Sequence, residues 1–248
     1  MKQRDYFSSC SSQYAQFRPR YPKQLFAWLA SVTKAQERVW DCACGNGQAS
    51  VDLAEHFQEV HATDLSAEQI ANAQAHPRVR YRQGLAEANG LPDNFVDLVT
   101  VAQALHWFDL PRFYQEARRV ARPGALLAVW CYGVCEIPAD RGNTELQHFY
   151  STIVGPYWTA ERRLVETGYQ TLEFPAPEVQ PPAFAMQLQW SLEQLLGYVS
   201  SWSATARYQK ERGEDPVPQL RSALQPHWGA SEQAHAVAWP ISVRAAPL

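Results

Sequence analysis

The 248-residue sequence has few cysteines, little charge excess and no long apolar run. Its five cysteines are an odd number, which argues against a complete disulfide framework and favours a reducing cytoplasm. A formal net charge of −3 gives no support to a general nucleic-acid-binding or membrane-surface protein. The apolar, uncharged run at residues 123–135 falls short of the ~20 apolar residues that span a bilayer. The first residues also lack an apolar stretch of signal-peptide length. We therefore expect a cytoplasmic protein without nucleic-acid or membrane partners.

Cysteine and histidine spacing gives no support to a metal site. Cys42 and Cys44 lie two residues apart, but no Cys/His pair with zinc-ligand spacing accompanies them. We therefore expect no bound metal.

The first half of the chain alternates β-prone stretches with helical patterns, and this alternation predicts a parallel sheet with right-handed crossovers. Strands are expected at 38–44, 59–65, 79–84, 95–105 and 125–133. Helices are expected at 46–57, at 66–76 with Ser66 as the N-cap, and at 109–121, where the Arg-Pro-Gly at 122–124 stops the helix.

The second half breaks this rhythm after about Val134. A proline-rich connector at 174–182 precedes an expected strand at 183–190, and one apolar seam predicts a single helix over 192–208. A further helix is expected at 215–229 and a final strand at 234–245, interrupted by Pro240.

These elements predict an α/β fold with a Rossmann-like, doubly wound, mostly parallel sheet of seven strands. We expect an N-terminal flap and first helix at 1–38, a cofactor-binding core at 39–135, and the rest of the sheet with a helical lid insertion at 136–248. The three segments are expected to form one structural domain. Residues 1–38 hold seven lysines and arginines against two acidic residues, so the flap is cationic.

A glycine turn follows the first expected strand, at Gly45 and Gly47 in "VWDCACGNGQ". A strand that runs through glycines into a helix exposes backbone N–H groups and lets a ligand approach the backbone closely. Asp64, 17 residues after Gly47, ends the second strand, where a carboxylate can accept hydrogen bonds from both ribose hydroxyls. Turn and acid together indicate a nucleoside-containing ligand.

The stretch Asp41 to Gly47 resembles the D-x-G-x-G-x-G motif of class I S-adenosylmethionine-dependent methyltransferases, with Ala43 in place of the first glycine. "GLAEANGLP" at 84–92, "VAQALHWF" at 101–108 and "RRVARPGALLAVW" at 118–130 resemble later segments of the same family, in the right order. "YAQFRPRYP" at 14–22 together with "ALHWF" resembles the small-molecule branch that contains trans-aconitate methyltransferases.

This resemblance implies S-adenosylmethionine as cofactor, S-adenosylhomocysteine as product and a small-molecule acceptor. It implies that the turn holds the methionine end, that Asp64 holds the ribose, that Leu65, Leu85 and Ala86 line the adenine, and that Gln103 and Trp107 flank the sulfur. The full set of expected cofactor contacts is Tyr14, Arg18, Asp41, Ala43, Gly45, Gly47, Gln48, Asp64, Leu65, Leu85, Ala86, Gln103 and Trp107.

The acceptor pocket has four candidates: Arg20, Tyr21, His106 and Trp190. Arginine forms bidentate pairs with carboxylates, so the cationic flap suits either an acidic substrate or the cofactor's own carboxylate. A carboxylate acceptor needs no general base at neutral pH, whereas a phenol or an amine often does. His106 is the weak candidate for such a base, and a packing role is the simpler interpretation of it. No other catalytic residue is assigned.

Two alternatives to a methyltransferase stay open on sequence grounds. The first is a nicotinamide-dependent oxidoreductase, which Ser50 opposes because the G-x-G-x-x-G fingerprint needs glycine there. The second is a binding module that senses the cofactor without turnover, since methyl displacement requires no signature catalytic residue.

Overall fold

A computed structural model of the protein describes residues 19–137, 140–175 and 177–248. Its centre is a seven-stranded sheet of order β3-β2-β1-β4-β5-β7-β6. The strands are β1 (Arg38–Cys42), β2 (Glu59–Asp64), β3 (Val79–Gln83), β4 (Val96–Ala102), β5 (Ala121–Tyr132), β6 (Phe184–Trp190) and β7 (His235–Pro247). β1 to β5 are parallel, and β7 pairs antiparallel with both β5 and β6. The predicted fold class and all seven strands are confirmed.

Adjacent residues of the central strands point to opposite faces of the sheet, and both faces are apolar. Val39, Leu98 and Ala128 belong to the cluster that holds α2 (Lys23–Val32) and α3 (Gln48–Leu53). Trp40 and Val99 belong to the cluster on the other face, which holds α5 (Leu110–Val120) and α7 (Arg162–Glu166). The sheet is therefore covered by helices on both sides.

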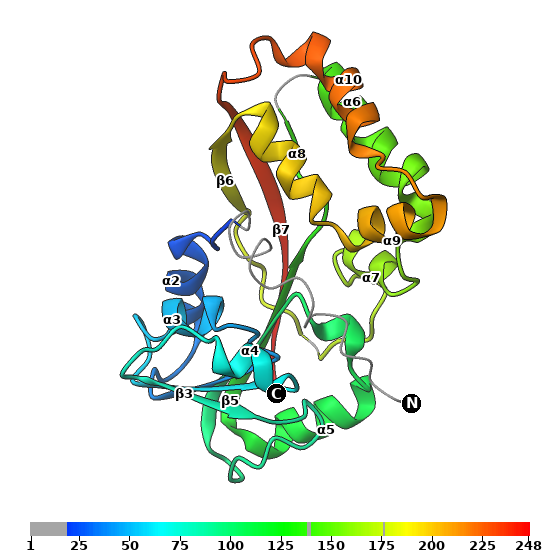
Figure 1. Ribbon diagram of the computed structural model, residues 1–248. Coiled ribbons are helices and arrows are strands. Elements are labelled where there is room, and N and C mark those ends of the chain that lie inside the picture. The colour runs from blue at the N-terminus through cyan, green and yellow to red at the C-terminus, as the bar shows by residue number, and fades with distance from the viewer. Residues whose placement is uncertain (1–18, 138–139, 176) are drawn as a thin grey trace.

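The two last strands extend past the parallel part of the sheet. β5 pairs with β7 only from Tyr132↔Ile241 to Leu126↔Pro247, whereas β6 pairs from Phe184↔Ile241 to Trp190↔His235. At a rise of about 3.3 Å per residue, this ribbon reaches about 20 Å beyond the end of β5. Figure 1 shows β7 extending from the lower part of the molecule into the upper part, where α8 lies next to it and α10 lies on the far side of α8.

Of the remaining helices, one lies between β2 and β3, and the others lie in the insertions before β6 and between β6 and β7. They are α4 (Ala67–Ala71) in the lower part, and α6 (Asp140–His148), η2 (Phe149–Ile153), η3 (Gly155–Tyr157), α8 (Leu192–Ser200), α9 (Ser203–Arg212) and α10 (Val217–Trp228). α10 packs against both α6 and α8. The sheet runs through the expected segments 39–135 and 136–248, whose boundary stays a prediction. No helix among the described residues has the length and apolarity to cross a membrane.

The single helix predicted over 192–208 is wrong, because the chain forms α8 and α9 with a break at Ser201 and Trp202. Trp202 has an extended backbone (φ −70°, ψ 138°), and its ring packs edge-on against Tyr150 and Tyr198 at 5.6 Å. Contacts of this long-range kind override local helical periodicity.

The predicted interruption at Pro240 is also wrong, since β7 continues through it. Ala238 exchanges both backbone hydrogen bonds with Glu136, on the side of β7 that faces β5. Pro240, two residues on, turns its nitrogen to that same side, where β5 has already ended at Tyr132. The missing N–H therefore removes no ladder hydrogen bond.

The start of one strand and the lengths of two helices also differ from expectation. Arg122 to Gly124 lie inside β5, with Gly124 at φ +84°, so α5 passes directly into the strand at Ala121. α3 has only six residues and α4 only five, although Ser66 does cap α4 by accepting a hydrogen bond from Gln69 N at 3.3 Å.

A buried arginine of β7 anchors the segment that follows α7. Arg244 is 7% exposed and pairs through Nη2 with Glu178 Oε1 at 2.7 Å. Its Nη1 donates to the carbonyl oxygens of Tyr169 at 2.6 Å and Leu172 at 2.9 Å. This one side chain therefore fixes the position of Tyr169 against the sheet.

Replacing Arg244 with Met should lower the free energy of unfolding by about 2–4 kcal/mol, because Glu178 and two carbonyl groups lose their donor. Arg221→Met is the matched control, since Arg221 forms an exposed pair with Glu193 that is worth at most about 1 kcal/mol. Denaturant unfolding of both variants measures the difference. Equal losses would contradict the anchoring role.

Candidate functional site

The turn after β1 has an unusual backbone. Ala43, Gly45 and Gly47 have positive φ angles of 54°, 55° and 86°. Cys44 N donates to Thr63 O at 3.0 Å, which ties the turn to β2, and Gly47 N donates to Cys44 O at 3.0 Å. Because α3 has only six residues, the turn itself, rather than a long helix, is the feature that a ligand would meet here.

The two glycines of the turn serve different purposes. A Cβ on Gly47 would collide with the Tyr81 hydroxyl, which donates to Gln74 O at 2.9 Å. Burial raises the pKa of Tyr81 to about 12, so the phenol stays protonated. A Cβ on Gly45 would meet only Gln69 Oε1, at 3.8 Å. Gly47 is thus needed for packing, whereas Gly45 leaves an open face where a ligand can approach the backbone.

Asp64 joins the end of β2 to this turn. Its Oδ2 accepts a hydrogen bond from Gly45 N at 2.8 Å, and its Oδ1 accepts one from Ser66 N at 2.8 Å. Each carboxylate oxygen has a further lone pair. The half-buried carboxylate can therefore hold the turn and still accept hydrogen bonds from a ribose, the role predicted for it.

Asp41 lies beneath the turn and not on its surface. Its side chain is fully buried and accepts hydrogen bonds from Ser50 Oγ at 2.6 Å and Thr100 Oγ1 at 2.9 Å. Burial raises its pKa from 3.8 to about 6, and the two hydroxyl donors oppose that rise. The Asp41 side chain therefore supports the turn from below, and the expected contact of this residue with the cofactor stays a prediction. Gln48 is half-buried at the start of α3.

Two exposed leucines lie on neighbouring loops beside the turn. Leu65 is 40% exposed and Leu85 is 41% exposed, while Ala86 is 9% exposed. β2 and β3 pair at Asp64↔Gln83, and Gln83 Nε2 donates to Leu65 O at 2.9 Å. The loops that hold these leucines therefore leave the sheet together, and they offer the apolar surface that a flat purine ring needs.

The end of β4 is held against β5. Gln103 has a φ of 56°, and its N and Nε2 donate to Trp130 O and Tyr132 O, both at 2.9 Å. The 3₁₀ turn η1 (Leu105–Trp107) follows, with the rings of His106 and Trp107 4.6 Å apart. The predicted sulfur-side pair Gln103 and Trp107 thus lies at the carboxyl end of β4.

His106 is poorly suited to act as a base. Its Nδ1 lies 2.9 Å from Tyr169 Oη, and Tyr169 is fully buried. Burial, and then the charge of Arg162, lower the pKa of His106 to about 4, so its ring is neutral at physiological pH. A base of that strength removes a proton from a phenol or an amine inefficiently.

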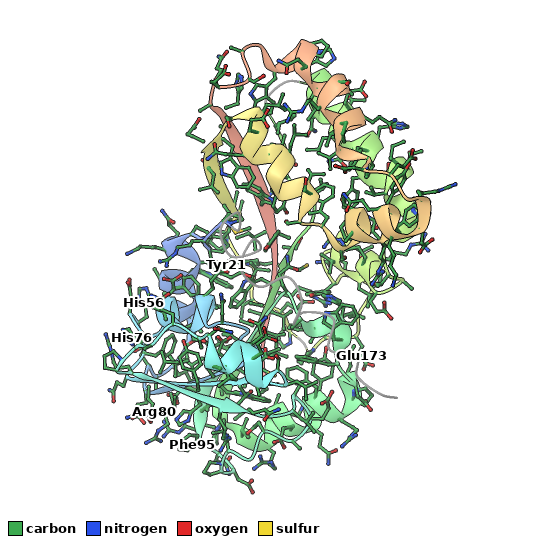
Figure 2. All side chains as sticks on the ribbon, viewed as in Figure 1. Tyr21, His56, His76, Arg80, Phe95 and Glu173 are labelled. Carbon is green, nitrogen blue, oxygen red and sulfur yellow. The ribbon has the colours of Figure 1, made fainter. Side chains whose placement is uncertain are left out.

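Of the four candidate residues in the flap, Arg20 and Tyr21 lie within the described residues. Tyr14 and Arg18 lie outside the described residues. Arg20 is exposed, and its charge acts on Asp52 of α3. Tyr21 packs edge-on against Trp130 at 5.6 Å and Tyr132 at 6.3 Å, and Figure 2 shows it near the middle of the molecule, beside the first turn of α2.

Trp190 lies in the core of the upper part, at the far end of the β6–β7 ribbon. It is 5% exposed, and its ring packs 4.9 Å from Trp239 and 5.5 Å from Tyr198. The aromatic neighbours occupy its surface, and the ribbon places it about 20 Å from the level of Tyr132. Trp190 is thus a core residue of the upper part, and its candidacy for the acceptor pocket stays a prediction.

Sequence reasoning missed five residues of this region: Ser50, Tyr81, Thr100, Tyr169 and Arg162. Ser50 stands at the position where a nicotinamide fingerprint needs glycine, and its hydroxyl instead supports Asp41. The other four come from distant segments, so no local pattern points to them. No group of three or more potential metal ligands occurs among the described residues.

Comparisons with known proteins agree on one family. A methyltransferase-domain family model matches residues 40–129. A candidate methyltransferase of Dictyostelium discoideum is 35% identical over 223 residues, 89% of this chain and 85% of that protein. The structure of a candidate type II methyltransferase from Anaeromyxobacter dehalogenans superposes with a TM-score of 0.89 at 44% identity, covering 93% of this chain and 98% of that one. The malonyl-[acyl-carrier protein] O-methyltransferase of Pectobacterium atrosepticum is 33% identical over 123 residues, 49% of this chain and 48% of that protein.

Asp41 should make stability depend on pH. Its pKa is higher in the folded chain (about 6) than its ordinary value of 3.8, so the stability it contributes is present at low pH and is lost as the pH rises through 6. Relative to Asp41→Asn, which does not titrate, the unfolding free energy of the wild type should fall by about 2–3 kcal/mol between about pH 4 and pH 7. Parallel stability curves for the two proteins would contradict this account.

Ala43 should be the strained residue of the turn, since a non-glycine residue at φ 54° costs about 1–2 kcal/mol. Ala43→Gly should therefore raise the unfolding free energy by about 0.5–1 kcal/mol. Ala49→Gly, in the neighbouring α3, should instead lower it by about 1 kcal/mol or more. Chemical denaturation distinguishes the two signs, and destabilisation by both changes would refute the strain at Ala43.

Proposed function

Because this chain belongs to the class I S-adenosylmethionine-dependent methyltransferases, we propose that it methylates a carboxylate of a small-molecule acid. S-adenosylmethionine supplies a methyl group on a positively charged sulfur. The nicotinamide alternative is set aside, since the chain's relatives are methyltransferases and Ser50 supports Asp41 where that fingerprint requires glycine.

The residues of the turn fit this cofactor. The open face of Gly45 accommodates the methionine end, with Ala43, Gly47 and Gln48 shaping the turn around it. Asp64 receives the ribose hydroxyls, and Leu65, Leu85 and Ala86 contact the adenine. Gln103 and Trp107 are then neighbours of the sulfur, at the carboxyl end of β4.

The observation that carries the choice of a carboxylate is His106. Held against Tyr169 and with a pKa near 4, it is a poor base, and an ionised carboxylate needs none. A carboxylate oxygen forms the new O–CH₃ bond as the C–S bond breaks, and sulfur keeps the electron pair. The products are a methyl ester and S-adenosylhomocysteine, and no proton is lost.

Two similarities support an acidic acceptor. The Pectobacterium relative is an O-methyltransferase of malonyl-[acyl-carrier protein]. The segment 14–22 and the "ALHWF" at 104–108 resemble the branch that contains trans-aconitate methyltransferases. Localisation in the cytoplasm stays a prediction.

Product analysis tests the proposal. The protein is incubated with methyl-labelled S-adenosylmethionine and a metabolite extract, and labelled products are identified by mass spectrometry. We expect labelled esters that release methanol in mild alkali. Labelled products that resist alkali, as amines and ethers do, would contradict a carboxylate acceptor, and binding without any labelled product would favour the cofactor-sensing alternative.

Asp64 should control cofactor affinity. Asp64→Ala removes an acceptor for the ribose and for Gly45 N, and hydrogen bonds to a charged group contribute about 1.5–3 kcal/mol. Calorimetry should therefore show about 10- to 100-fold weaker binding of S-adenosylhomocysteine. Asp93→Ala, which removes an exposed carboxylate paired with Arg119, should bind as the wild type does. Unchanged affinity in Asp64→Ala would contradict the assigned role.

A further inference from the structure

Arg162, the first residue of α7, is held in a fixed orientation by two aromatic residues. Its Nε donates to Tyr150 Oη at 2.8 Å, and its guanidinium carbon lies 4.8 Å from the centroid of the Trp158 ring. Tyr150 is fixed in turn, because its hydroxyl donates to Glu166 Oε1 at 2.8 Å. A guanidinium that rests on an indole and bonds through Nε keeps its plane and loses little entropy when it binds a ligand.

Within the part of the chain that the structure describes, the two terminal nitrogens of this guanidinium have no partner. Among the described residues, no hydrogen bond or ion pair within 4.0 Å joins Arg162 Nη1 or Nη2 to an acceptor. Three other arginines differ, since Arg119, Arg122 and Arg244 each pair with carboxylates. Keeping a half-buried guanidinium without a counter-ion costs free energy. Binding an anion recovers that free energy.

Arg162 lies at the carboxyl edge of the sheet, next to the end of β4. α7 contacts both η1 and β5, and Cys131 Sγ donates to Val165 O at 3.7 Å. The positive charge of Arg162 lowers the pKa of His106, and the negative charge of Glu161 opposes this shift. Glu166, the other acid of this helix, is bonded to Tyr150 and does not neutralise the guanidinium.

We propose that Arg162 is the residue that binds the carboxylate of the methyl acceptor, through Nη1 and Nη2 above the Trp158 ring. This inference rests on the proposed function, and it assigns the selection of acidic acceptors to α7. The pair uses one lone pair of each carboxylate oxygen and leaves the other available for transfer. Trp158 and Tyr150 exclude water from the ion pair and so strengthen it.

Acetate is a suitable probe because the smallest common carboxylate fits a pocket of any shape. The protein, labelled with ¹⁵N-arginine and saturated with S-adenosylhomocysteine, is titrated with acetate and with neutral acetamide. We expect a saturable shift of the Arg162 Nε resonance with acetate only, with a dissociation constant on the order of millimolar to tens of millimolar. Arg221, paired with Glu193, is the internal reference and should not saturate.

Three results would overturn the inference: no saturable shift at Arg162, an equal shift with acetamide, or tighter binding of inorganic phosphate than of acetate. The last result would assign the site to phosphate esters. Failure of the wild type to bind S-adenosylhomocysteine would instead refute the proposed function, so the two failures are distinguishable.

Variants of α7 give a second test with the acceptor found by product analysis. Arg162→Gln should raise the KM for that acceptor at least tenfold and leave the affinity for S-adenosylhomocysteine unchanged, and Arg162→Lys should restore part of the loss. Arg163→Gln is the matched control, because it removes the same charge from the next, exposed residue. Equal effects of Arg162→Gln and Arg163→Gln, with both variants folded by thermal melting, would show that only the net charge of α7 matters.

Discussion

The carboxylate of Asp64 is the contact on which the candidate site depends. A turn with three positive φ angles in five residues cannot be held by regular secondary structure, so its N–H groups need partners elsewhere. Asp64 provides one for Gly45 and another for Ser66, and thereby joins the ends of β1 and β2 at one edge of the sheet. The same edge receives the ends of β4 and β5, which places the turn after β1 beside the end of β4.

Backbone strain is concentrated along that edge. Ala43, Gln103 and Tyr169 are three of the four described non-glycine residues with positive φ. Each is held by contacts of other segments. Ala43 is held through its neighbour Cys44, which donates to Thr63, Gln103 is held by the end of β5, and Tyr169 is held by Arg244. Strain of this kind persists only where surrounding structure imposes it, and it marks functional sites more often than ordinary loops. Beneath it, the buried Asp41 and its two hydroxyl donors connect β1, α3 and β4.

The sequence was informative where short-range patterns decide the structure. The alternation of apolar strands with helical patterns predicted the sheet. The spacing from Gly47 to Asp64 predicted that the glycine turn and the end of the second strand meet at its edge. Prediction failed where contacts between residues far apart in the sequence decide the local structure. The aromatic partners of Trp202 split a helix, and the early end of β5 lets β7 pass through Pro240. Arg162 was missed because Tyr150 and Trp158 approach it only in the folded chain.

The most direct test of the central claim is a crystal structure of the protein with S-adenosylhomocysteine. The account predicts the ribose hydroxyls on Asp64, the adenine between Leu65 and Leu85, and the amino-acid end against the open face of Gly45. A ligand bound elsewhere, or a turn whose open face is filled by the protein's own side chains, would contradict it.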